Sequence, residues 1–194
     1  EAMEIEMDIA DALMKNRWTR MLVRIYYVKI KNNPIKLARL MGVKIGKNCR
    51  INGDPYKIFG SEPWLISLGN HVQVTSGAAF LSHEGAIWVA KGIKPELEKY
   101  DKFLPIKVGN NVMLGTGCLI MPGITIGDNV IIAARSVVTK DVPSNTIVGG
   151  VPARPISNME QFLTKAEVGL VETKYMTALQ KKEFLMKHKS EWFE

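Results

Sequence analysis

The chain contains three histidines, His71, His83 and His188, which are its candidates for proton transfer at neutral pH. Imidazole accepts and returns a proton near neutral pH, so one histidine can act first as a general base and then as a general acid. His83 is followed by Glu84 and, five positions on, by Trp88. We take His83 as the candidate base and Glu84 and Trp88 as acceptor-side candidates. For Glu84, orienting His83, contacting an acceptor and facing solvent all remain open, because consecutive residues of an extended segment point to opposite sides.

A period of six residues is the strongest pattern in the sequence. Aliphatic residues recur at every sixth position from Val108 to Val138, and a second series of small or apolar residues runs four positions later, from Val112 to Val148. Six is the period of a chain that makes a short strand, turns a corner and repeats, so that three hexapeptides complete one triangular coil. The pattern predicts a mainly β fold of stacked coils with aliphatic ladders inside.

The repeat also indicates how the chain is divided. Weaker copies at residues 45–49 and 68–80 are out of register with the late block, which indicates insertions. We expect a repeat domain at 44–156, preceded by a basic helical segment at 1–43 and followed by a helical segment at 157–194. The period breaks at about 84–105, which predicts a protruding loop.

The two cysteines, Cys49 and Cys118, both fall in the inward-pointing series of the repeat and outside any Cys-x-x-Cys or Cys/His motif. They predict buried free thiols rather than a disulfide framework or a zinc site. No segment approaches the ~18 consecutive apolar residues of a membrane span, and the acidic start lacks the features of a secretory signal. We expect a cytoplasmic protein that requires no metal.

The N-terminal segment is strongly basic, because no Asp or Glu occurs between Asp11 and Asp54 while eleven Lys and Arg residues do. Apolar residues at helical spacing predict an amphipathic helix; they are Met14, Trp18, Met21, Leu22, Ile25 and Val28. We expect this helix to cap the open end of the coils, whose strands would otherwise be exposed. The alternatives are association with a membrane surface and a simply solvated basic face. No nucleic-acid partner is expected.

Three groups of residues resemble the hexapeptide-repeat acyltransferases, especially the capsular-polysaccharide, galactoside, maltose and streptogramin (virginiamycin) O-acetyltransferases. They are Ile120-Met121-Pro122-Gly123 with Thr125-Ile126-Gly127, Ser136-Val137-Val138-Thr139-Lys140-Asp141-Val142-Pro143, and Gly150-Val151-Pro152-Ala153-Arg154. Residues 80–88 are most similar to the capsule-type members, in which an acidic residue follows the catalytic histidine. The resemblance covers about residues 43–156. It implies a left-handed parallel β-helix, a homotrimer, and acetyl-CoA bound as co-substrate in a groove between neighbouring coils.

The resemblance further implies roles for single residues. The backbone N–H near Thr116 would donate to the tetrahedral oxygen of the intermediate. Ala134 and Thr139 match positions beside the pantetheine arm of the co-substrate. Lys140 and Arg154 match positions near the nucleotide phosphates, where fixed cations offset the negative charge of the ligand.

Together these features predict acetyl transfer from acetyl-CoA to a hydroxyl of a sugar or polysaccharide precursor, with His83 as base. Met113, where many members carry Trp, is a further acceptor-side candidate. The alternatives are a xenobiotic of the streptogramin type and an amino sugar acetylated on nitrogen. A metal-dependent protein of the same repeat would need three histidines around one ion, which the chain does not supply in the required spacing. A non-catalytic scaffold is the remaining alternative, because a fold does not fix a function.

Overall fold

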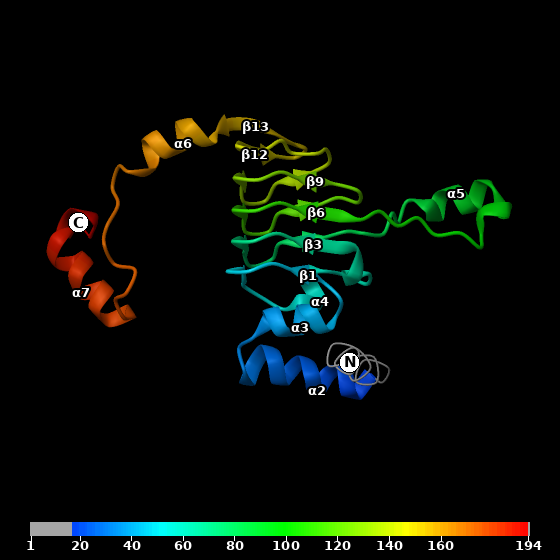
Figure 1. The fold of residues 1–194 in the computed structure, drawn as a ribbon, viewed down its shortest axis with the longest axis horizontal. Helices are drawn as coiled ribbons and strands as arrows, with labels where there is room; N and C mark the ends of the chain where they lie inside the picture. Colours follow the sequence, from blue (N-terminus) through cyan, green and yellow to red (C-terminus); the bar gives the residue numbers. More distant parts are fainter. Residues whose placement is uncertain (1–16, 194) are drawn as a thin grey trace. The chain divides into compact units, whose positions relative to one another are not determined.

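The computed structural model describes residues 17–193, and its centre is a column of short strands in three sheets (Figure 1). Sheet A contains β1 (Lys44–Ile45), β3 (Ile66–Leu68), β6 (Ile106–Val108) and β9 (Thr125–Ile126). Sheet B contains β2 (Arg50–Ile51), β4 (Val72–Val74), β7 (Val112–Leu114), β10 (Val130–Ile132), β12 (Thr146–Gly150) and β13 (Ala153–Asn158). Sheet C contains β5 (Ala79–Phe80), β8 (Leu119–Ile120) and β11 (Val137–Val138).

The strands of successive coils pair in parallel, so each coil passes once through the sheets before the next begins. Leu68 is the register partner of Val108, and Val108 is the partner of Ile126. The second pair is separated by eighteen residues, as one coil of three hexapeptides requires, whereas the first is separated by forty because an insertion lies between. The stacked coils and the early insertion that the period predicts are confirmed.

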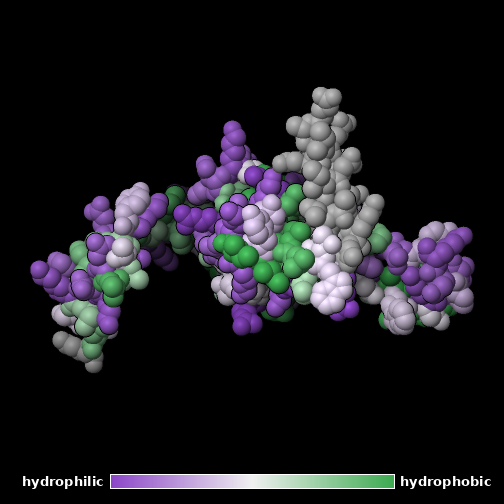
Figure 2. Space-filling model, turned by 90° about the horizontal axis from the view of Figure 1, so that it is seen from below, coloured by the Kyte–Doolittle hydropathy of each residue, from purple (hydrophilic) through white to green (hydrophobic). Residues whose placement is uncertain are grey.

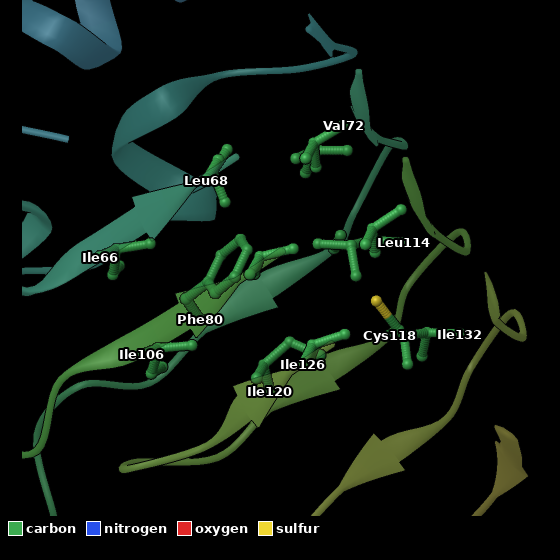
Figure 3. Packing of buried hydrophobic residues seen from close by; sticks show 14 of the residues in the cluster. Ile66, Leu68, Val72, Phe80, Ile106, Leu114, Cys118, Ile120, Ile126 and Ile132 are labelled. Carbon is green, nitrogen blue, oxygen red and sulfur yellow. The ribbon is translucent and has the colours of Figure 1, made fainter. Parts of the chain in front are cut away.

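The core is the inside of this column, where the aliphatic residues of the repeat stack on their counterparts one coil away (Figure 3). Ile106, Ile120 and Ile132 are fully buried. Removing each such side chain from water contributes about 1.5–3 kcal/mol. Cys49 and Cys118 are also buried free thiols, as the repeat predicts, and burial raises the pKa of Cys118 to about 11.

A ladder of side-chain amides runs along the corner between sheets A and B. Asn111, Asn129 and Asn145 have φ values of 55°, 54° and 62°, a left-handed conformation that asparagine tolerates better than most residues. Each amide bonds the next, at 2.8 Å and 3.0 Å. His71 extends the ladder, with its Nδ1 at 2.8 Å from Asn111 Oδ1. His71 therefore has a structural position at this corner.

An arm interrupts the repeat between β5 and β6 and leaves the side of the column (Figure 1). Its limbs meet at the base, where His83 and Phe103 form an antiparallel bridge. Farther out, Lys91 Nζ lies 2.9 Å from Asp101 Oδ1, and this hydrogen bond lowers the pKa of the Asp101 carboxyl. The arm also contains two short helices, α5 (Ile87–Ile93) and η3 (Pro95–Leu97), so part of the expected loop is helical.

The helices at the N-terminal end differ from the expectation. They are α2 (Arg17–Ile25), η1 (Tyr26–Ile30), α3 (Pro34–Leu40), α4 (Pro55–Ile58) and η2 (Pro63–Leu65). The first of these does not supply the buried part of the expected cap, because α2 contains no buried residue. Instead α3 packs on β1 and β2 and buries Leu37 and Ala38 completely. Only three residues join α3 to β1, so this short connection places α3 on the first coil. Met14 lies outside the described residues.

At the other end, β13 returns antiparallel to β12. The helix α6 (Met159–Ala166) follows, and residues from Gln161 onward form a separate compact unit with α7 (Ala178–His188) and η4 (Ser190–Trp192). Thr177 begins α7 through a capping box with Gln180. None of the helices within residues 17–193 is both long and apolar enough to cross a bilayer.

The expectation of a mainly β protein is wrong in its proportions. The helical elements of the described chain hold more residues than the strands, which are only two to six residues long. The reason is physical: a hexapeptide coil spends much of its chain on corners, while both ends and the arm form helices.

Candidate active site

His83 lies at the base of the arm, three residues after β5. The antiparallel bridge to Phe103 fixes its backbone, and the two rings pack with their centroids 4.7 Å apart and their planes tilted by 46°. The His83 side chain is 39% exposed. The imidazole is therefore held on one side by the arm and open to an approaching substrate on the other.

Glu62 faces this imidazole, and sequence reasoning did not find it. Its Oε1 lies 3.9 Å from His83 Nδ1, and its side chain is only 14% exposed. The other carboxylate oxygen, Oε2, accepts a hydrogen bond of 3.2 Å from Ser82 Oγ, a residue that is buried. Glu62 stands in the insertion between coils, where no period marks it. The neighbouring Pro63 begins η2, but nothing in the local sequence relates Glu62 to His83.

Glu84 does not contact the imidazole among the contacts that the structure shows. Its Oε1 accepts a hydrogen bond from the Ala86 N–H at 3.3 Å, which holds the turn before α5. The Glu84 N–H donates to the Lys102 carbonyl at 2.9 Å and ties the two limbs of the arm together. Trp88, on α5, is 80% exposed. These two acceptor-side candidates therefore belong to the arm, one at its base and one on its helix.

Thr116 lies at the corner between sheets B and C, in the turn between β7 and β8. Its carbonyl accepts from the Arg135 N–H of the next coil at 2.8 Å. Among residues 17–193 its own N–H has no hydrogen-bond acceptor, so it is available to a ligand. Gly115 makes the close stacking possible, because a Cβ there would meet Ala134 N at 2.5 Å. Ala134 itself is exposed at the same corner, one coil further.

His83 and Thr116 lie at opposite edges of sheet C in one chain. The Leu81 N–H donates to the Ile120 carbonyl and the Met121 N–H to the Val138 carbonyl, so the segments that follow β5, β8 and β11 are stacked in register. Thr116 instead precedes β8. One residue therefore lies before the strands of sheet C and the other after them, at different corners of the coil. A single chain does not bring these two groups together.

The remaining candidates are exposed residues of the late coils. Thr139 and Lys140 follow β11, at the same corner as His83 and two coils further along the column. Arg154 lies on β13 opposite Gly149, and its Nη1 donates to the Ala153 carbonyl at 2.9 Å. Met113 projects outward from the middle of β7. Within residues 17–193 no group of three or more His, Cys, Asp or Glu side chains is arranged to hold a metal ion.

Comparison with known proteins agrees with this architecture. Residues 105–140 match the family model of the bacterial transferase hexapeptide (six repeats). Protein CapG of Staphylococcus aureus is 44% identical over 148 residues, which cover 76% of this chain and 84% of that protein. Galactoside O-acetyltransferase of Escherichia coli (strain K12) is 34% identical over 125 residues, covering 63% of this chain and 57% of that protein.

A solved structure is also similar: a hexapeptide-repeat acetyltransferase of Vibrio cholerae O1 biovar eltor, complexed with acetyl-coenzyme A. It shares 28% identity with a TM-score of 0.53, and the match covers 61% of each chain. The stacked hexapeptide coils and these matches together define a transferase of the hexapeptide class. The chain belongs to the hexapeptide-repeat O-acetyltransferase family, and it is an acetyl-CoA-dependent acyltransferase.

Proposed function

We propose that this protein transfers the acetyl group of acetyl-CoA to a hydroxyl of a sugar or polysaccharide precursor, with His83 as general base. The observation that carries the proposal is the setting of His83. Its imidazole is partly exposed at the edge of the coils, and a mostly buried carboxylate, Glu62, lies beside its Nδ1. This leaves Nε2 as the nitrogen for proton transfer to and from the substrate.

In the proposed reaction the acceptor oxygen attacks the thioester carbonyl while His83 takes its proton. The tetrahedral oxyanion accepts a hydrogen bond from the Thr116 N–H. When the intermediate collapses, the carbon–sulfur bond breaks and the imidazolium returns the proton to the departing thiolate. Glu62 stabilises the imidazolium that exists between these two proton transfers. The only covalent changes are the new ester bond and the free thiol of CoA.

The site is proposed to lie between two chains of a homotrimer of left-handed coils. The separation of His83 and Thr116 on one chain supports this arrangement, because a groove between two columns can join the edge of one to the edge of the other. Acetyl-CoA would then lie along that groove, with Ala134 and Thr139 beside the pantetheine arm. Lys140 and Arg154 would offset the charge of its phosphates.

A sugar hydroxyl is the preferred acceptor for two reasons. Galactoside O-acetyltransferase, a relative over more than half of this chain, is named for such a substrate. The arm beside His83 also presents exposed aromatic side chains, Trp88 and Tyr100, which suit the apolar faces of sugar rings. The proposed compartment is the cytoplasm, in keeping with two buried thiols that remain unpaired.

The experiment that tests the chemistry compares His83→Ala with the parent protein in acetyl transfer from acetyl-CoA. CoA release is followed with a thiol reagent across a panel of sugars, amino sugars and xenobiotic alcohols. We expect kcat to fall by ~10²–10⁴-fold with CoA affinity retained, because a base acts mainly in the transition state. Activity within a few-fold of the parent would remove His83 from the mechanism. Turnover of only amino sugars or only xenobiotics would replace the proposed acceptor.

The shared site is tested by mixing two inactive variants. Chains with His83→Ala are refolded or co-expressed with chains that carry both Lys140→Ala and Arg154→Ala. Mixed trimers contain some interfaces in which both halves are intact, so part of the activity should return. Native mass spectrometry verifies that mixed trimers form, and mixed trimers without activity would contradict a site built from two chains.

A further inference from the structure

The helix α2 turns its apolar side outward. Trp18 and Leu22 are 69% and 63% exposed, and Met21 and Ile25 are exposed as well. These four residues follow the i, i+3, i+4, i+7 spacing of one helix face, and we call them the apolar stripe. Met21 and Ile25 line a pocket shared with Ile51 of the first coil, but packing does not cover Trp18 and Leu22, so it does not explain the whole apolar face.

The surroundings of the apolar stripe are cationic. Arg17, Arg20 and Arg24 lie on α2, Lys29 and Lys31 follow it, and residues 17–31 contain no Asp or Glu. The view onto α2 from below shows a patch of hydrophobic residues with hydrophilic residues around it (Figure 2). Apolar side chains bordered by Arg and Lys are the composition of a helix that lies in the interface of an anionic bilayer.

A hollow beside the stripe adds a second feature. It has a volume of about 600 Å³ and is lined by Arg17, Trp18, Arg20, Met21, Arg24 and Tyr56. Arg24 also forms an ion pair with Asp54, which anchors α2 to the start of α4. Guanidinium groups bind phosphate oxygens in a two-pronged geometry, and Tyr and Trp favour the boundary between lipid headgroups and chains. The hollow therefore places guanidinium groups where a lipid phosphate would lie if the stripe were inserted.

We propose that α2 binds the surface of an anionic membrane, with the apolar stripe among the lipid headgroups and the arginines of the hollow at lipid phosphates. The described part of α2 is nine residues long, and no helix within residues 17–193 is long and apolar enough to cross a bilayer, so the proposal places this segment on the membrane surface. The proposal concerns location and is independent of which acceptor the enzyme uses. It places the transferase beside acceptors carried on lipid, which a dissolved enzyme would meet less often.

The test is binding of the full-length protein to vesicles. Vesicles of phosphatidylcholine with 30% phosphatidylglycerol are compared with pure phosphatidylcholine at low salt, by sedimentation and by tryptophan emission. We expect binding to the anionic vesicles only, with a blue shift that disappears in Trp18→Phe. Leu22→Glu should lower the bound fraction at least ten-fold. Arg17→Gln with Arg20→Gln should lower the partition constant about 25-fold, from about five-fold per cation.

Two controls distinguish binding through α2 from nonspecific binding of the protein to vesicles. Leu179→Glu makes the same change at an exposed position of α7, and Lys181→Gln with Lys182→Gln removes two cations there; both should bind as the parent does. Because the substituted residues Arg17, Trp18, Arg20 and Leu22 are all exposed, the α2 variants should keep their melting temperature and their acetyl-transfer rate on soluble acceptors. Equal binding to neutral vesicles, or equal binding by parent and Leu22→Glu, would overturn the proposal. So would a change in oligomeric mass on Leu22→Glu without vesicle binding, which would show that another copy covers the stripe.

Discussion

The contact between Glu62 and His83 allows a prediction whose size follows from the structure. Glu62→Gln removes the negative charge 3.9 Å from His83 Nδ1 but keeps an oxygen that can accept from Ser82 Oγ. At this distance a carboxylate stabilises an imidazolium by about 1 kcal/mol with the dielectric constant of water and by about 4 kcal/mol at an effective value of 20. His83 is 39% exposed, so the lower part of this range applies, ~1–2 kcal/mol.

Such a loss in the transition state lowers kcat by about 5–30-fold. The assay is steady-state acetyl transfer by parent and variant, with the KM for acetyl-CoA and the midpoint of thermal unfolding measured on the same preparations. We expect both of these to stay unchanged, since Gln fills the same space and Glu62 contacts no part proposed to bind CoA. The variant Glu62→Asp, which restores the charge at a longer distance, should recover part of the rate.

Glu84→Gln is the matched control, because it neutralises the neighbouring carboxylate, which bonds the Ala86 N–H instead. Its kcat should remain within two-fold of the parent. The reasoning is refuted if Glu62→Gln also stays within two-fold, or if Glu84→Gln loses as much. A loss that appears only in the KM for acetyl-CoA would equally refute it, because an electrostatic effect on the imidazolium acts in the transition state.

Three further outcomes are expected. Gly115→Ala should lower the midpoint of thermal unfolding by roughly 5–10 °C, because the added Cβ would meet backbone atoms at 2.5 Å and overpacking costs about 1–3 kcal/mol. Gly92→Ala is the control and should not lower the midpoint, since a Cβ at Gly92 would meet nothing within 4 Å. Because burial raises the pKa of Cys118 to about 11, from 9.0, only the unfolded thiol ionises between these values. The free energy of unfolding should therefore fall as pH rises from about 9 to 11, and less so in Cys118→Val, as urea titrations would show. Lys140→Ala and Arg154→Ala should raise the dissociation constant of CoA in calorimetry more than they lower kcat, and unchanged affinity in both would place the phosphates elsewhere.

The sequence by itself determined the repeating part of the molecule. Inward residues such as Ile120 and Ile132 are buried where the period of six places them, and Cys118 is buried with them. This succeeds because burial in a solenoid depends only on position within a short local repeat, so the pattern of one coil predicts the next. The same regularity supports the resemblance to the transferase family, whose motifs lie mostly within the late coils.

Only the tertiary structure decided what lies outside the period. Glu62 and His83 belong to separate insertions, and the path of the chain between coils brings them together. The exposure of the apolar face of α2 could likewise not be predicted from the sequence, because helical spacing shows that an apolar face exists but not what covers it. His83 and Thr116 fall at opposite edges of sheet C for a related reason. The position of a residue along its coil follows from the local sequence. The pairing of one edge of a column with another depends on packing between distant residues and between chains.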